Sequence, residues 1–236
     1  MIQKLACRVE RVVAHGERVY TLVLAPERPA PRFRPGQFLH LALDPYDPTG
    51  FWPESRVFSI ASAPQERTSL RITYAVHGRF TERMEAEARE GSQVWIKLPY
   101  GDFLIDADAG VALFAGGTGV TAFTAFLGAL PPDHPRQVVL AYGARHDRLL
   151  IYRDALERCA ARARALEVMY FVEHPAGIVP STHEGRVSVD AVWPRLRDPR
   201  TTQFYISGPP PMLKGIAQTL ADRGVDPGAV HIDAWE

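Results

Sequence analysis

The stretch "GVALFAGGTGVTAFTAFLGAL", residues 110–130, joins a continuous apolar run to a glycine cluster and then to a second apolar run. The first run is typical of a buried strand, and the second is typical of an apolar helix. Gly116, Gly117 and Gly119 let the backbone turn sharply and approach a ligand closely. Because a helix N-terminus presents free N–H groups and partial positive charge, this stretch predicts a phosphate site.

Two features limit this prediction. Gly117, Gly119 and Ala122 match the pattern GxGxxA, but the acidic residue expected about 20 positions later is not evident. The stretch lacks the GKS or GKT of a P-loop. The alternative, in which the glycines serve only to pack a helix against a strand, stays open at this point.

Toward the C-terminus, residues 106–236 alternate between strands and helices. The strands are "RQVVLAYGAR", "ALEVMYFVE" and "TTQFYISGPPP", and the helices are "LLIYRDALERCAARA" and "PMLKGIAQTLADRG". This alternation predicts a Rossmann-like parallel sheet covered on both faces. Ligands bind beyond the carboxyl ends of such strands, so Ser207 and Gly208 are expected in the binding crevice.

Toward the N-terminus, residues 1–105 consist of short strands and turns, among them "RVYTLVLAP", "FRPGQFLHLAL", "RVFSIAS" and "SQVWIKLPYG". Strands at this spacing predict a closed or nearly closed antiparallel barrel. The exception is "FTERMEAEARE", a predicted helix with Thr81 as its cap. The sequence therefore predicts two domains, residues 1–105 and 106–236.

Three stretches of the first domain are candidates for ligand contact. "RVFSIAS" (Arg56–Ser62) combines burial with a possible anion-binding arginine, but an ordinary strand with a surface arginine fits equally well. "HGRFTERM" (His77–Met84) is a second glycine-to-helix junction, for which a plain capped helix is the alternative. The loop aromatics Tyr46, Phe51 and Trp52 either cover a ligand or pack on the barrel, and packing is favoured.

Composition excludes several functional classes. Lys+Arg and Asp+Glu both number 27, so nothing indicates a nucleic-acid partner. Two cysteines are too few for an iron–sulfur cluster, and no CxxC or HExxH motif indicates a metal site. The N-terminus is too charged for a signal peptide, and no apolar run approaches about 18 residues. No membrane span is therefore expected, and the cytoplasm is the default location.

The order "RVFSIAS", "HGRFT", "YGDF", "GGTGVT", "YGAR", "SGPPPM" and a terminal aromatic in "HIDAWE" resembles the ferredoxin–NADP reductase superfamily over nearly the full chain. The resemblance implies a six-stranded, antiparallel Greek-key barrel that binds flavin, followed by a Rossmann-like nicotinamide domain. It also implies a tightly bound FAD, with NADH or NADPH as co-substrate.

The resemblance assigns roles to individual residues. Arg56 is expected on the FAD pyrophosphate and Ser59 near flavin N5. Ser207, Asp233 and Trp235 complete the expected catalytic set, with Trp235 stacked on the isoalloxazine. The other expected cofactor contacts are Phe58, Tyr74, Val76, Gly78, Arg79, Phe80 and Thr81 for the flavin, and Gly117, Thr118, Gly119, Thr121, Arg145, Glu173, Gly208, Pro209 and Met212 for the nicotinamide nucleotide.

The chain departs from the family pattern at three positions. Phe58 replaces a tyrosine, which removes a hydrogen bond to the flavin. Ser207 replaces a cysteine beside the nicotinamide, so slower hydride transfer is expected. Glu236 extends the chain one residue beyond Trp235, which loosens the expected stacking.

The choice between NADH and NADPH depends on the end of one strand. Glu173 and His174 stand where NADP-using relatives have a Ser-Arg pair that holds the 2′-phosphate. A carboxylate repels a phosphate and accepts hydrogen bonds from ribose hydroxyls, so NADH is favoured. Arg145, Arg148 and Arg186 keep an alternative phosphate pocket open.

The resemblance implies hydride transfer from nicotinamide to FAD, and then electron transfer to a separate acceptor. A ferredoxin, a flavodoxin, an oxygenase component, a cytochrome or a small ferric chelate fits this role. Two alternatives remain. The protein is a non-catalytic subunit that binds flavin or nucleotide, or it is a flavin reductase that releases reduced flavin and accepts FMN in place of FAD.

Overall fold

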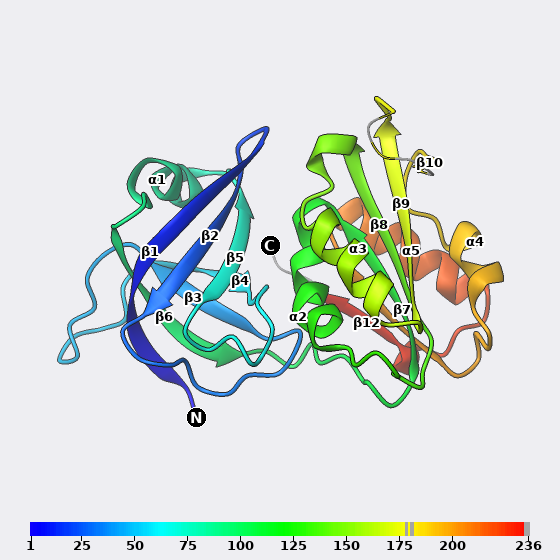
Figure 1. The fold of residues 1–236 in the computed structure, drawn as a ribbon, viewed down its shortest axis with the longest axis horizontal. Helices are drawn as coiled ribbons and strands as arrows, with labels where there is room; N and C mark the ends of the chain where they lie inside the picture. The colour runs from blue at the N-terminus through cyan, green and yellow to red at the C-terminus, as the bar shows by residue number, and fades with distance from the viewer. Residues whose placement is uncertain (178, 180–181, 234–236) are drawn as a thin grey trace. The chain divides into compact units, whose positions relative to one another are not determined.

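The computed structural model describes residues 1–177, 179 and 182–233. The chain divides into two compact units, Met1–Leu104 and Ile105–Glu236. Figure 1 shows the strands of the first unit wrapped around a core, and the sheet of the second unit flanked by helices. Each unit is described separately below.

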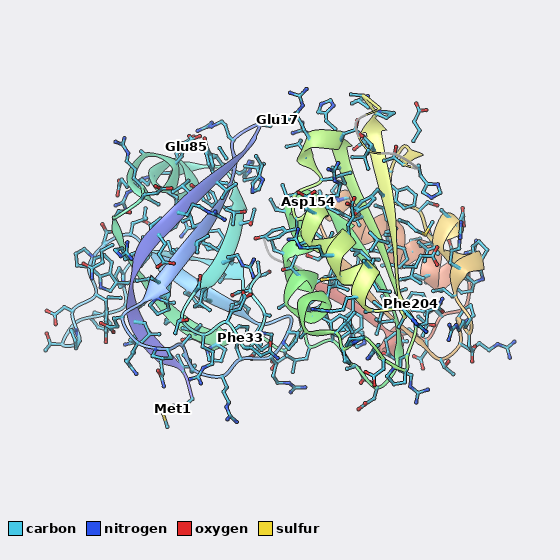
Figure 2. All side chains as sticks on the ribbon, in the orientation of Figure 1. Met1, Glu17, Phe33, Glu85, Asp154 and Phe204 are labelled. Carbon is cyan, nitrogen blue, oxygen red and sulfur yellow. The ribbon has the colours of Figure 1, made fainter. Side chains whose placement is uncertain are left out.

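The first unit is a six-stranded antiparallel sheet with the order β4-β3-β6-β1-β2-β5. Its strands are β1 (Gln3–Gly16), β2 (Val19–Pro26), β3 (Phe38–Ala42), β4 (Ser55–Ser59), β5 (Leu70–Ala75) and β6 (Gln93–Tyr100). The helix α1 (Arg79–Glu87) lies between β5 and β6 in the chain. Glu85 on α1, labelled in Figure 2, accepts hydrogen bonds from Arg18 and from the Tyr20 hydroxyl, which ties the helix to the barrel.

The two edge strands of this sheet are joined just beyond β4. Ala61 N donates to Arg71 O at 2.8 Å, and Arg71 N donates to the Ser62 hydroxyl oxygen at 3.2 Å. With β4 linked to β5, the strands β3, β4 and β5 are consecutive neighbours and β6 returns beside β3, which is a Greek key. The predicted antiparallel barrel is confirmed.

Replacement of Ser62 with alanine is expected to weaken this closure. Ser62 is fully buried, so Ser62→Ala leaves the Arg71 N–H without its partner. The free energy of unfolding should fall by about 1–3 kcal/mol, as measured by urea denaturation. Ser69→Ala, at a partly exposed position before β5, is the matched control and should change stability by less than about 0.5 kcal/mol. Equal effects of the two substitutions would contradict the role of Ser62.

The helix α1 begins two residues earlier than its predicted cap. Gly78 is the N-cap residue and makes no side-chain cap bond, so the assignment of Thr81 as the cap was wrong. Thr81 lies inside the first turn, where its hydroxyl accepts from His77 N at 2.6 Å and donates to Gly78 O at 3.0 Å. A glycine fits the N-cap because its φ is +80°, a conformation that strains other residues.

The second unit is a parallel sheet with the order β10-β9-β8-β7-β11-β12. Its strands are β7 (Gly110–Gly116), β8 (Val138–His146), β9 (Leu166–His174), β10 (His183–Glu184), β11 (Thr202–Ser207) and β12 (Val230–Asp233). Its helices are α2 (Thr121–Ala129), α3 (Arg153–Arg162), α4 (Val189–Val192) and α5 (Pro210–Asp222). Figure 1 shows α2 and α3 on one side of the sheet and α5 on the other.

Buried side chains on both faces hold this sheet between its helices. Phe114 and Phe204, the latter labelled in Figure 2, pack with Ile216 and Leu220 of α5 on one face. On the other face the fully buried Tyr142 directs its hydroxyl to Leu149 O. The predicted parallel sheet with two covered faces is confirmed. Because the strand order reverses between β7 and β11, the ligand crevice of such a sheet lies at the carboxyl ends of these two strands.

Candidate functional site

At the ends of β7 and β11, two loops touch backbone to backbone. A Cβ on Gly119 would lie 2.5 Å from Ser207 C and 2.8 Å from Gly208 N. A Cβ on Gly116 would lie 2.6 Å from the Met212 sulfur. Only glycines permit this approach, so the packing explanation of the glycine cluster holds for these two positions.

Gly117 has a different environment. Its φ is +54°, and a Cβ built there would meet no atom within 4 Å. The chain makes a 3-10 turn over Gly117–Val120 before α2 begins at Thr121. The open face at Gly117 therefore lies just before the N-terminus of α2, where free N–H groups favour a phosphate. The cluster thus combines close packing by Gly116 and Gly119 with an open face at Gly117.

Beside this cluster lies a buried carboxylate. Asp233, at the end of β12, is opposite Ser207 in the parallel register, and its Oδ2 accepts a hydrogen bond from the Ser207 hydroxyl at 2.9 Å. Asp233 is 6% exposed, and its Oδ1 has no hydrogen-bond partner among the described residues. Burial raises the pKa of Asp233 to about 6, although the Ser207 hydrogen bond acts in the opposite direction. An unsatisfied buried oxygen of this kind is available to a polar ligand group.

The end of β9 carries a charge pair. Glu173 Oε2 accepts from Arg186 Nε at 2.9 Å, and the Arg186 side chain is 81% exposed. Arg145 is exposed at the end of the neighbouring strand β8. His146 and His174, paired in the register of these strands, have ring centroids 5.4 Å apart. The sequence alone did not reveal that Glu173 is already bonded to an arginine.

In the first unit, Arg56 lies close to the start of α1. Its guanidinium carbon is 5.0 Å from the centroid of the Phe80 ring, and Nη2 pairs with Glu54 at 3.1 Å. About half of the Arg56 side chain is exposed. A Cβ on the N-cap Gly78 would meet no atom within 4 Å. An arginine beside an open helix N-terminus suits a phosphate group.

Aromatic rings line the barrel next to this arginine. The rings of Phe58 and Tyr74 are 6.2 Å apart and meet edge to face, while Tyr20 and Tyr74 are 5.6 Å apart. Burial raises the pKa of the Tyr74 hydroxyl. Val76 packs against the same core. Ser59 is opposite Phe38 in the register of β3 and β4, so it lies on the face opposite to Arg56 and Phe58.

The structure thus groups the sequence-predicted residues within each unit. Arg56, Phe58, Tyr74, Val76, Gly78, Arg79, Phe80 and Thr81 gather around β4, β5 and α1, while Gly117, Thr118, Gly119, Thr121, Ser207, Gly208, Pro209, Met212 and Asp233 gather around the ends of β7 and β11. Arg145 and Glu173 lie farther along the sheet, at the ends of β8 and β9. Trp235 and Glu236 lie outside the described residues.

The sequence named Gly116 among the glycines of the cluster and Arg186 only as part of an alternative phosphate pocket. The ion pair of Arg186 with Glu173 was not predicted, because the two residues are 13 positions apart in the chain. The three aromatic residues of the loop before β4 differ: the rings of Tyr46 and Trp52 are in tilted contact, with centroids 5.2 Å apart, whereas Phe51 is 99% exposed.

No three His, Cys, Asp or Glu side chains of the described residues gather in a way that could hold a metal ion. No helix within the same residues has the length and apolar character needed to cross a membrane.

The chain has two domains, an antiparallel barrel and a Rossmann-type sheet. Each domain has an open glycine at a helix start, a geometry that favours a phosphate group. Residues 113–218 match the family model described as "Oxidoreductase NAD-binding domain". The chain has the same fold as the Flavohem-like FAD/NAD-binding domain of nitric oxide dioxygenase from Vibrio cholerae O1 biovar El Tor. The TM-score is 0.83 at 18% identity, over 98% of both chains.

Curated proteins give a consistent result. The chain is 27% identical to a flavohemoprotein of Pseudomonas aeruginosa over 96% of its own length and 57% of that protein. It is 29% identical to the ferredoxin reductase component of 3-ketosteroid-9-alpha-monooxygenase of Mycobacterium tuberculosis, over 98% of its own length and 65% of that protein. The chain therefore spans less than two thirds of these relatives. The predicted resemblance to the ferredoxin–NADP reductase superfamily is confirmed.

Proposed function

We propose that the protein is an FAD-dependent oxidoreductase that takes electrons from NADH or NADPH and passes them to a separate acceptor. The observation that carries this proposal is the arrangement at the switch point of the second sheet. There, Gly119 packs on the backbone of Ser207 and Gly208, and Asp233 has one buried oxygen, Oδ1, with no hydrogen-bond partner among the residues that the structure describes. The match to the oxidoreductase NAD-binding domain model supports the same conclusion.

In the first domain, the chain's own groups suit an FAD. Arg56 and the N-terminus of α1 would bind the pyrophosphate, and Phe58 and Tyr74 would pack along the ring system. When bound, FAD supplies two-electron acceptance from a nicotinamide and one-electron release to an acceptor. The protein contributes position and electrostatics to this chemistry.

In the second domain, the turn over Gly117–Val120 would bind the nicotinamide nucleotide's pyrophosphate. Ser207 and Asp233 would orient the nicotinamide end. An ionised Asp233 accepts the Ser207 proton in a hydrogen bond, which holds the serine hydroxyl in one rotamer. The free Oδ1 would then accept from a ligand N–H group, such as a carboxamide.

NADH is the donor that the charge pair at β9 favours. Glu173 Oε1 would accept hydrogen bonds from the adenosine ribose, while its charge repels a 2′-phosphate. Arg186 reduces this repulsion, because its Nε is bonded to Glu173 at 2.9 Å. The pair therefore favours NADH without excluding NADPH.

Glu173→Gln is expected to shift this preference. With the repelling charge gone and Arg186 released, the ratio of kcat/KM for NADPH over NADH should rise about tenfold, the change that corresponds to about 1.4 kcal/mol. Steady-state assays with both nucleotides measure the ratio. Glu184→Gln removes an exposed carboxylate from β10 and is the matched control. An unchanged ratio in Glu173→Gln would disprove the role of this carboxylate.

The electron acceptor is proposed to be a separate protein or domain. Relatives that match the chain include components of oxygenase systems and flavohemoproteins, and both names imply an electron-accepting partner. A ferredoxin or an oxygenase component would fit.

The experiment that tests the proposal is an anaerobic titration of the purified protein with NADH and NADPH, followed by absorbance. Loss of a flavin band near ~450 nm, faster with NADH, is the expected result. A flavin that neither nucleotide reduces would instead indicate a non-catalytic subunit. A flavin lost on gel filtration would indicate a reductase that releases its flavin.

A further inference from the structure

A chain of hydrogen-bonded polar side chains runs across the outer face of the barrel, from β1 over β2 to β5. His15 Nε2 and Thr21 Oγ1 are 2.8 Å apart, and Thr21 Oγ1 and Thr73 Oγ1 are 2.6 Å apart. Thr21 and Thr73 are directly opposite each other in the register of β2 and β5. Their neighbours Leu22 and Ile72 belong to the buried core, so the two hydroxyls point away from it. We call these three residues the His–Thr–Thr chain.

An irregularity of β1 places His15 at one end of this chain. The register of β1 and β2 shifts between Ala14 and Gly16, which makes His15 the extra residue of a β-bulge. Bulges re-aim a side chain and are frequent next to active sites. The hairpin turn follows at once, and Figure 2 labels Glu17 in it. His15 is half-buried, whereas both threonines are buried, so the chain leads from solvent to two buried hydroxyls.

The imidazole of His15 is suited to accept a proton. Burial lowers the pKa of His15, so the ring is neutral at neutral pH. The other side chains of the same face and of the adjoining turn are Val13, Glu17, Arg18, Val19, Arg71 and Ala75. Arg18 pairs with Glu85, and Arg71 pairs with Glu66, so a carboxylate compensates each arginine.

The inner end of the chain lies level with the expected flavin contact of β4. The strands β4 and β5 are joined where Ala61 N donates to Arg71 O at 2.8 Å. Two residues before Ala61 is Ser59, and two residues after Arg71 is Thr73. Because β4 and β5 run in opposite directions, Ser59 and Thr73 come to the same level and the same face. Ser59 is the residue expected near flavin N5, so the His–Thr–Thr chain leads from solvent toward that atom.

The proposed function requires a path for one proton. The hydride from NADH brings its own proton to flavin N5, so reduction takes none from solvent. When the two electrons then pass singly to an acceptor, this proton stays behind and must leave the flavin. Overall, NADH gives NAD⁺, two electrons and one proton. The electrons go to the acceptor, and the proton goes to water.

We propose that Thr73, Thr21 and His15 carry this proton from the flavin to solvent. The N5–H bond breaks, and Thr73, level with Ser59, takes up the proton while its own hydroxyl proton moves to Thr21. The proton of Thr21 moves to His15 Nε2, and the imidazolium then gives a proton to water. Only O–H and N–H bonds form and break in these steps. This proton path rests on the flavin-dependent function proposed above.

Anaerobic stopped-flow absorbance separates the two halves of the reaction. The protein is reduced with one equivalent of NADH and then mixed with ferricyanide, a small one-electron acceptor. Thr21→Val removes the central hydroxyl at nearly constant volume, and it should slow this oxidation about a hundredfold. Reduction by NADH should keep its wild-type rate, because the hydride needs no solvent proton.

Two further substitutions are matched to Thr21→Val. Thr21→Ser keeps a hydroxyl at the centre of the chain and should be oxidised at the wild-type rate. Thr68→Val makes the same chemical change at an exposed position of the same domain, and it should also leave both rates unchanged.

His15→Ala tests the outer end of the chain. Oxidation should again slow about a hundredfold, and imidazole added to the buffer should restore the rate, because a half-buried position admits a small base from solvent. In the wild type the oxidation rate should rise with pH as His15 loses its proton, with a midpoint below the ordinary pKa of histidine. This rise should be absent in His15→Ala.

NMR provides a readout that needs no turnover. The ¹⁵N signal of His15 Nε2 in the oxidised protein depends on its hydrogen bond to Thr21 at 2.8 Å. The signal should therefore move in Thr21→Val and stay in place in Thr68→Val.

Three results would overturn the proton path. These are a wild-type oxidation rate in Thr21→Val, a slow rate in His15→Ala that imidazole leaves unchanged, and a His15 signal that does not respond to loss of the Thr21 hydroxyl. Failure of the proposed function is distinguishable, because NADH would then leave the wild-type flavin oxidised. Dithionite would reduce that flavin instead, and the oxidation rates would still test the proton path.

Discussion

Gly119→Ala is expected to damage both the stability and the nucleotide affinity of the second domain. The added Cβ would lie 2.5 Å from Ser207 C and 2.8 Å from Gly208 N, and nearest of all to Ser207 O. These atoms belong to the backbone at the end of β11, which cannot rotate away as a side chain can. The β7 and β11 loops must therefore separate, at a cost of about 3 kcal/mol in the free energy of unfolding.

The same displacement moves the start of α2 relative to Ser207. Because an ångström of misplacement can reduce an enzymatic rate about a hundredfold, kcat/KM for NADH should fall by a similar factor. Urea denaturation and steady-state kinetics measure the two effects. Gly215→Ala is the matched control, because a Cβ in α5 meets no atom within 4 Å and alanine favours a helix by about 1 kcal/mol. If the two variants behaved alike, the close contact at Gly119 would not exist in solution.

Asp233→Asn is expected to stabilise the protein at neutral pH and above. Burial raises the pKa of Asp233 from 3.8 to about 6, so the folded state binds this proton more tightly than the unfolded state does. The contribution of this proton to the free energy of unfolding is fully present below pH 3.8 and is lost as the pH rises through 6. Above that range the ionised carboxylate lowers the free energy of unfolding by about 3 kcal/mol. Asparagine avoids this loss because it is uncharged, and its amide oxygen can still accept the hydrogen bond from the Ser207 hydroxyl.

Denaturation of the wild type and of Asp233→Asn at pH 5 and at pH 8 measures this effect. The stability gain from asparagine should be large at pH 8 and smaller at pH 5. Asp133→Asn removes the same charge from an exposed turn, and its small effect should not vary in this way. A gain that is equal at both pH values would show that Asp233 does not titrate between them. A stabilising change at this position would indicate that the carboxylate is kept for function.

The barrel and the parallel sheet were both predictable from local patterns. The short strands separated by turns in residues 1–105 and the continuous apolar run "GVALFAG" are local patterns, because each depends on residues close together in the chain. The start of α1 was predicted incorrectly, because threonine is common at helix N-caps and Thr81 was therefore taken as the cap. The actual N-cap, Gly78, is determined by a positive φ that the sequence does not state.

The candidate site also combines features that the local sequence predicted with contacts that it did not. The glycine cluster at residues 116–119 pointed to the β7 end of the crevice, although Gly116 and Gly119 serve close packing and Gly117 alone of these glycines has open space at its Cβ position. The individual contacts were not predictable. Ser207 and Asp233 are 26 residues apart in the chain and meet at 2.9 Å only because β11 and β12 are neighbours in parallel register.

The sequence by itself determined the order of elements, the two kinds of sheet and the positions of the flexible glycines, since these depend on residues close together in the chain. Tertiary structure alone decided which side chains face each other across strands. It brought Arg71 to Ser62, Arg186 to Glu173, and Lys4 and His40 to either side of Lys97. These pairings depend on strand order and register, which are set by burial of the whole core and which no local pattern encodes.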